Sequence, residues 1–266
     1  MTHRATSASL PERKFRFFRS VAALILREME SSYGRSPGGY LWALIEPVAA
    51  IALMSVVFEL IFRAPSLGSN FPLFFATGFM PFLLYMTVSQ TTSTAIRYSR
   101  PLLEYPAVTF LDALVARVAL NTLTNLVVSA LVLWGIVLIY RLNPILDWSA
   151  IFLSMAMGVS LAFGVGTMNC YLISQFQIWE RVWAVLNRPL FLVSAVLFIP
   201  EDVPAQYRDI LMLNPVASVV TEMRKGFYAT YEAVHVRPLY VFSVAGVLAT
   251  LGLFLLIRNH KQIMER

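Results

Sequence analysis

The sequence predicts an all-α integral membrane protein with about six transmembrane helices, an N-terminal amphipathic interface helix and two short outer helices between spans five and six. Three observations support this fold class. Of the 266 residues, 58% are hydrophobic and only 14% are charged, against roughly 25% charged in an average soluble domain. The mean hydropathy is +0.67. The apolar residues also gather in long stretches, which disfavours a soluble enzyme, a disordered chain or a fibrous protein.

Six stretches are long enough to cross a bilayer, because a hydrocarbon core about 30 Å thick requires about 20 mostly apolar helical residues. They lie near residues 40–62, 72–93, 115–140, 150–173, 183–199 and 239–257. The third is overlong and carries Asn121 and Asn125, so its first turns are expected to project from the membrane or to face other helices. The fifth contains Asn187, Arg188 and Pro189 near its start, which disfavour a transmembrane helix there.

Basic residues predict the orientation of these spans. An even number of spans places both chain ends on one side, which then holds about fifteen Lys and Arg against about six on the other side. Cytoplasmic loops carry such an excess, so both termini are assigned to the cytoplasm. The chain then divides into a cytoplasmic segment at 1–39, a six-span domain at 40–257 that includes an outer loop at 200–238, and a cytoplasmic tail at 258–266.

An amphipathic helix is expected before the first span, because apolar residues recur there at spacings of three and four with basic residues around them. The apolar set is Phe15, Phe18, Ala22, Ile25 and Met29, and the basic set is Arg16, Arg19 and Arg27. A basic amphipathic helix of this kind lies along a membrane surface that contains anionic lipid. The alternative is a helix that only anchors the N-terminus.

The outer loop at 200–238 is too long and too apolar for a bare connection. Asn214 and Pro215 separate two apolar helical faces, formed by Val203, Tyr207, Ile210 and Leu211 and by Val216, Val219, Val220, Met223 and Phe227. Two short helices are therefore expected on the outer side, each too short to cross the bilayer. Pro215 suits the first position of the second helix, where its missing N–H is not needed.

No constellation for catalysis, metal binding or nucleic-acid binding is recognisable in the sequence. Cys170 is the single cysteine, and the histidines are too scattered for a ligand set, at His3, His235 and His260. Gly158, Ala162 and Gly166 recur every four residues without the Lys-Ser or Lys-Thr of a phosphate loop. This spacing instead indicates close packing of helices in lipid.

Polar and aromatic residues in the first two spans are candidates for a transport pathway. Burying the carboxylate of Glu46 in hydrocarbon costs on the order of 2 to 3 kcal/mol, so Glu46 is placed at the inner mouth of a pathway, with Pro47 as a local kink. An interfacial carboxylate or structural cap explains Glu46 equally well. Trp42 and Tyr85 belong to the aromatics near span ends, which suit either the headgroup belt or stacking on sugar rings.

Three segments resemble the ABC-type-2 permeases. The run from Arg27 to Pro47 is similar to the N-terminal signature of this family. The segment Leu102 to Pro106 after span two agrees with it, as does Leu213-Asn214-Pro215 followed by Arg224 before span six. The resemblance covers nearly the whole chain and is greatest to the permeases that export capsular polysaccharide.

The resemblance implies one half of the membrane pathway of an ABC exporter in the bacterial inner membrane. Two copies of this chain would form the conduit for a lipid-linked polysaccharide, and two copies of a separate ATPase chain, which binds ATP and Mg²⁺, would drive it. This chain is then a transport subunit with no enzyme activity, cofactor, metal or nucleic acid of its own. Periplasmic and outer-membrane export proteins would be further partners.

The resemblance also implies the positions of two sites. Coupling to the ATPase falls on the N-terminal helix and on the loop between spans two and three, at Arg27, Glu30, Tyr33, Arg35, Arg97, Arg100, Leu103, Glu104 and Tyr105. The outer gate contains Asn214, Pro215 and Arg224. The pathway or its inner mouth is expected at Trp42, Glu46, Pro47 and Tyr85 from the residue types described above, and not from the resemblance. A loop that is merely solvated remains an alternative for the charged coupling residues.

Two further classes of function stay open from the sequence. The same fold would serve an exporter of O-antigen, teichoic acid or small hydrophobic drugs. An integral-membrane glycosyl or acyl transferase is a different class, and it would require positioned acids, bases or metal ligands near the membrane interface.

Overall fold

The structure is a computed structural model that describes residues 16–33, 39, 41–103 and 109–265, and all regular structure in these ranges is helical. Five of the helices are long and apolar enough to cross a membrane. They are α2 (Leu41–Ile61), α3 (Phe71–Ser93), α5 (Phe110–Ile139), α6 (Trp148–Gln175) and α11 (Pro238–Glu265). Each coincides with one predicted span, so the all-α membrane fold is confirmed.

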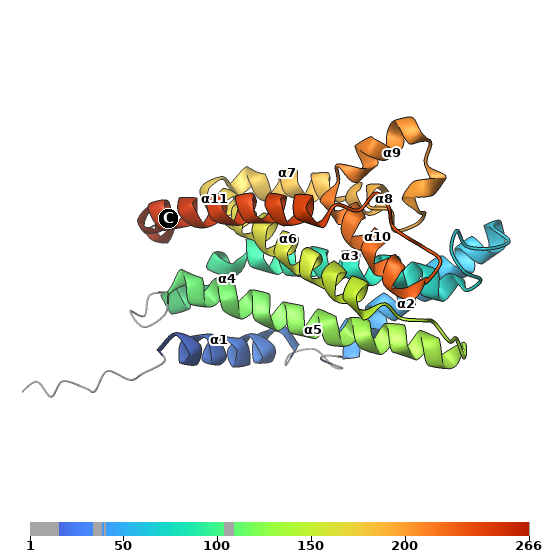
Figure 1. Cartoon of the computed structure of the whole chain (residues 1–266). Helices are drawn as coiled ribbons and strands as arrows, with labels where there is room; N and C mark the ends of the chain where they lie inside the picture. Colours follow the sequence, from blue (N-terminus) through green and yellow to red (C-terminus); the bar gives the residue numbers. More distant parts are fainter. Residues whose placement is uncertain (1–15, 34–38, 40, 104–108, 266) are drawn as a thin grey trace, which may run out of the picture.

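The predicted fifth span, 183–199, is not a continuous helix, which corrects the expectation of six regular spans. Its residues belong to α7 (Gln177–Asn187), to α8 (Leu190–Val193) and to turns that continue to Ile199. The break falls at Pro189, whose ring removes the N–H that a longer helix would need. In Figure 1 the chain nevertheless runs along the bundle through α7 and α8, and we call this stretch, residues 177–199, the interrupted crossing.

The two ends of the bundle carry different elements (Figure 1). At one end lie α4 (Ala95–Leu103), the start of α1 (Arg16–Tyr33) and the end of α11. At the other end lies α9 (Ala205–Met212). These are called the α4 end and the α9 end below.

Helix α6 occupies the centre of the bundle and packs against α3, α11 and α10 (Pro215–Phe227). Its small residues permit this close approach. A Cβ at Gly166 would lie only 2.6 Å from the Cβ of Thr92 on α3, and a Cβ at Gly164 would overlap the backbone of Ala245 on α11. The predicted use of the Gly158, Ala162 and Gly166 stripe for helix packing is therefore confirmed.

Polar caps determine where three crossings begin. The Asn70 side chain accepts the N–H of Leu73 at 2.9 Å at the start of α3. Thr109 and Asp112 form a reciprocal capping box at the start of α5, and Asp147 caps α6. A cap of this kind contributes about 1 kcal/mol to helix stability.

The predicted N-terminal helix is confirmed as α1, but its packed face differs from the expected one. Val21 and Leu24 are buried against small residues of α5, whereas Ala22 and Met29 are exposed. The spacing rule allowed either face, because apolar residues lie on both. The face of α1 that is buried is the one that packs against α5, whose first turns lie alongside α1 (Figure 1).

The outer loop contains the short helix η1 (Pro200–Asp202), α9 and α10, so the two predicted outer helices are confirmed. Pro215 is the first residue of α10, as expected. The two helices differ in burial: α9 has no buried residue, whereas nearly every residue of α10 is buried between α3 and α6. One outer helix is thus part of the core.

Candidate functional site

The interrupted crossing presents backbone carbonyls that no continuing helix can satisfy. Helical geometry ends at Val193, and unpaired polar groups of the backbone are costly at membrane depth. The side chain of Asn214 donates to the carbonyl of Val193 at 2.9 Å and to the hydroxyl of Ser194 at 3.0 Å. Its oxygen accepts the N–H of Val216 at 3.0 Å and so caps α10. Asn214 therefore joins the end of α8 to the start of α10.

Arg224 supplies the remaining donors to this segment. Its Nη1 donates to the carbonyls of Ala195 at 2.6 Å and Phe198 at 2.5 Å, and its Nη2 donates to the carbonyl of Val196 at 2.6 Å. Residues 193–198, which we call the bound segment, are thus held by Asn214 and Arg224. Both residues were predicted for the outer gate, and the structure brings them to one short stretch of chain.

Arg224 is fully buried, with 0% of its surface exposed. Its guanidinium lies 4.2 Å from the centre of the Phe74 ring, which adds a favourable cation–π contact. A Cβ at Gly78 would come within 2.8 Å of Nη2, so only glycine lets α3 approach this closely. Arginine stays protonated in proteins, so this side chain is a buried cation, compensated by three carbonyl dipoles.

At the α4 end, the predicted coupling residue Arg97 pairs with Glu180 of α7. The contact is bidentate, with Nη1 to Oε2 at 2.7 Å and Nη2 to Oε1 at 2.9 Å. More than half of the Arg97 side chain remains exposed. Arg97 thus connects α4 to the interrupted crossing and still presents surface to a partner.

A second cluster at this end forms around Arg117 of α5, which is 4% exposed. Its Nη2 donates to Glu28 of α1 at 2.8 Å, and its Nη1 donates to the carbonyl of Thr91 at 3.0 Å and the hydroxyl of Thr94 at 3.1 Å. The ring of Tyr98 on α4 lies 4.3 Å from its guanidinium carbon. One side chain therefore joins α1, the end of α3, α4 and α5.

The other predicted coupling residues are placed less completely. Arg27 is exposed on α1. Glu30 and Tyr33 belong to α1, and Arg100 and Leu103 belong to α4. The remaining three lie outside the described residues, at Arg35, Glu104 and Tyr105.

The predicted pathway residues do not share one surface. Trp42 and Glu46 are exposed on α2, and Pro47 is buried in the same helix. Tyr85 is buried in the core cluster with Leu84 and Met157. The surface that Trp42 and Glu46 share is consistent with an inner mouth, but Tyr85 packs inside the single chain.

No group of three or more His, Cys, Asp or Glu side chains that could hold a metal ion occurs in the described part of the chain. Cys170 is buried, and His235 lies 3.4 Å from Nη1 of Arg208.

Three charged residues of these clusters were not selected from the sequence: Glu28, Arg117 and Glu180. Arg117 carried a usable signal, since it lies inside the apolar stretch 115–140 and ionisable residues within spans are usually functional. Glu28 lies within the Arg27 to Pro47 signature. No local sequence pattern indicated a role for Glu180, because its partner, Arg97, is 83 positions away in the sequence and only the fold brings the two side chains together.

The fold defines a multi-pass membrane protein, and its family follows from comparison with known proteins. Residues 19–228 match the family described as ABC-2 type transporter. Since this range is most of the chain, the protein belongs to that family.

Three relatives resemble the chain over nearly their whole length. The polysialic acid transport protein KpsM of Escherichia coli is 27% identical, over 88% of this chain and 92% of KpsM. The capsule polysaccharide export inner-membrane protein CtrC of Neisseria meningitidis is 24% identical, over 92% of both chains. The protein of the same description from Haemophilus influenzae, BexB, is 25% identical, over 81% of this chain and 83% of BexB.

Proposed function

We propose that this chain is the membrane-spanning permease subunit of an ABC exporter that moves lipid-linked capsular polysaccharide across the bacterial inner membrane. The observation that carries the proposal is the similarity, along most of both chains, to permeases named for capsule or polysialic acid export. Membership of the ABC-2 type transporter family and five helices suited to a bilayer support it. The chain acts as a transport subunit and not as an enzyme.

Energy for transport comes, in this proposal, from two copies of a separate ATPase chain that bind ATP and Mg²⁺. They attach to two copies of the permease at the α4 end, which faces the cytoplasm together with both chain termini. The start of α1 and the end of α11 lie at the same end of the bundle (Figure 1), which supports placing both termini on one side of the membrane, and the excess of basic residues on that side supports the cytoplasmic assignment. Periplasmic and outer-membrane export proteins continue the path beyond the α9 end.

Two connections carry movement from the ATPase into the membrane. Motion of α1 and α4 reaches α3 and α5 through Arg117, and it reaches the interrupted crossing through Arg97 and Glu180. At the α9 end, Asn214 and Arg224 hold the bound segment beside the exit. Transport then requires that ATP binding and hydrolysis favour different arrangements of these contacts.

Deletion of the gene tests the proposed cargo. We expect capsular polymer to disappear from the cell surface and to accumulate inside the cell, with recovery when the gene is returned on a plasmid. The measurement is polymer content of the surface and cytoplasmic fractions. Normal surface capsule, or retention of O-antigen in place of capsule, would contradict the proposal.

Charge reversal tests the connection between α4 and α7. Arg97→Glu, alone or with Arg100→Glu, is expected to lower export and stimulated ATP hydrolysis while leaving membrane insertion intact. The free energy of unfolding should change by less than about 1 kcal/mol, because exposed ion pairs contribute little. Exchanging the charges in Arg97→Glu/Glu180→Arg should restore both activities. Failure of this exchange would assign Arg97 to direct contact with the ATPase.

A further inference from the structure

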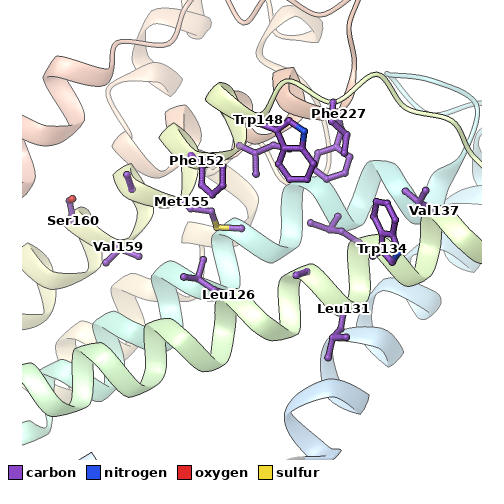
Figure 2. Close-up of a pocket in the computed structure, with 15 residues that line it drawn as sticks. Leu126, Leu131, Trp134, Val137, Trp148, Phe152, Met155, Val159, Ser160 and Phe227 are labelled. Carbon is purple, nitrogen blue, oxygen red and sulfur yellow. The ribbon is translucent and has the colours of Figure 1, made fainter. Parts of the chain in front are cut away.

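A long apolar groove separates α5 from α6. The two helices follow one another in the chain, yet each packs far more closely on α3 than on the other. The groove between them has a volume of about 800 Å³. Figure 2 shows Trp134 on α5 and Trp148 and Phe152 on α6 along this groove, with Leu126 and Met155 between the helices and Phe227 beside Trp148.

The length of the groove along α6 is close to the thickness of one bilayer leaflet. Its lining on α6 extends from Trp148 to Ser160, which corresponds to about 18 Å at 1.5 Å per residue. One leaflet of the hydrocarbon core is about 15 Å thick. The groove opens on the outer surface of the helix bundle. More than half of the surface is exposed for three residues of its walls, Trp134, Phe152 and Leu131.

A polar pocket of about 500 Å³ continues the groove at the α9 end, and Leu146 lines both. Its charged residues are Asp147, Lys225 and Glu232. Hydrogen bonds from Ser149 and Ala150 lower the pKa of Asp147, so this carboxylate is ionised at neutral pH. Lys225 also lies 3.8 Å from Glu222. Carboxylates therefore outnumber ammonium groups around this pocket.

We propose that the groove and the pocket together bind one zwitterionic phospholipid whose headgroup carries a primary ammonium. An acyl chain lies between α5 and α6, the phosphate contacts Lys225, and the ammonium contacts Asp147 and Glu232. The inference depends only on the chain being a membrane protein and not on the polysaccharide cargo.

The charges select this headgroup over others. A purely anionic headgroup would satisfy Lys225 but would meet the excess of carboxylates, which repel it. A quaternary ammonium has no N–H to donate to a carboxylate, whereas a primary ammonium has three donors. A helix of a second copy would supply apolar side chains to the groove, whereas a phospholipid supplies both an acyl chain to the groove and two opposite charges to the pocket.

Native mass spectrometry of the full-length chain, purified in mild detergent, tests the headgroup. Phosphatidylethanolamine, phosphatidylglycerol and phosphatidylcholine are added in equal amounts. We expect one phosphatidylethanolamine to be retained per chain, roughly tenfold more tightly than the other two, a ratio that corresponds to about 1.4 kcal/mol. Equal retention of the three lipids, or retention of none, would overturn the proposal.

Two substitutions locate the bound lipid. Ala156→Trp places an indole in the groove, at an exposed position of α6, and should abolish retention. The matched control is Leu251→Trp, on the exposed face of α11, which should leave retention unchanged. Glu232→Gln should remove the preference for the primary ammonium without emptying the groove. Unchanged lipid retention in the Ala156→Trp protein would contradict the assignment.

A cysteine crosslink distinguishes a lipid from a second copy of the chain. Cys170 is buried, so an oxidant acting on Phe152→Cys reports on the groove. We expect no disulfide-linked dimer from this variant in native membranes. Efficient crosslinking would place a second chain over the groove and would overturn the proposal.

Discussion

Replacement of Arg224 by methionine is expected to unfold the bound segment and abolish export. Methionine keeps much of the apolar volume but removes the donors to Ala195, Val196 and Phe198. Each buried carbonyl left without a donor costs about 1 to 3 kcal/mol, so the free energy of unfolding should fall by several kcal/mol. Thermal unfolding in detergent and limited proteolysis around residues 193–202 measure the effect.

The matched control for this experiment is Arg237→Met, at an exposed arginine just before α11. It should leave thermal unfolding and export unchanged. Arg224→Lys should recover part of the stability, because an ammonium donates to carbonyls but lacks the planar fork of a guanidinium. Wild-type stability and export in Arg224→Met would show that the bound segment does not depend on this side chain.

Replacement of Glu28 by glutamine is expected to have the second large effect. It leaves the guanidinium of Arg117 buried without its counter-charge, and breaking a buried pair in this way costs about 3 to 5 kcal/mol. Export and stimulated ATP hydrolysis should both fall sharply. The control is Arg19→Gln, an exposed position of α1.

A double substitution separates stability from coupling at the same place. In Glu28→Met/Arg117→Leu both charges are gone, and apolar replacements of a buried pair are often neutral for stability. We expect thermal unfolding close to that of the wild type, with export still impaired because α1 and α4 have lost their common contact. Normal export in this protein would limit the pair to a structural role.

Hydropathy located five crossings because the signal is additive along one helix. Every residue of α2 or α11 contributes its own transfer free energy, so a window of about 20 residues identifies the span without knowledge of its neighbours. The helix starts follow similarly local rules, as Asn214-Pro215 demonstrates for α10. These features require no information from distant parts of the chain.

The polar connections could not be predicted because they join distant positions. Glu28 and Arg117 are 89 positions apart, and Arg97 and Glu180 are 83 apart. The sequence signals at Arg97, Asn214 and Arg224 identified residues of interest, but not what they bind. The break at Pro189 was visible as a local irregularity, whereas the donors that make an irregular crossing tolerable come from α10.

The order of residues in the bound segment has a consequence for biosynthesis. The carbonyls of Ala195, Val196 and Phe198 precede their donor, Arg224, by 26 to 29 positions. At translation rates of about 5 to 20 residues per second, a few seconds pass before that donor exists. Until then these three carbonyls lack the donors that they have in the folded chain, so we expect this stretch to insert stably only after α10 has been synthesised. A nascent chain arrested before Arg224 should therefore remain accessible to a chaperone or protease at this stretch.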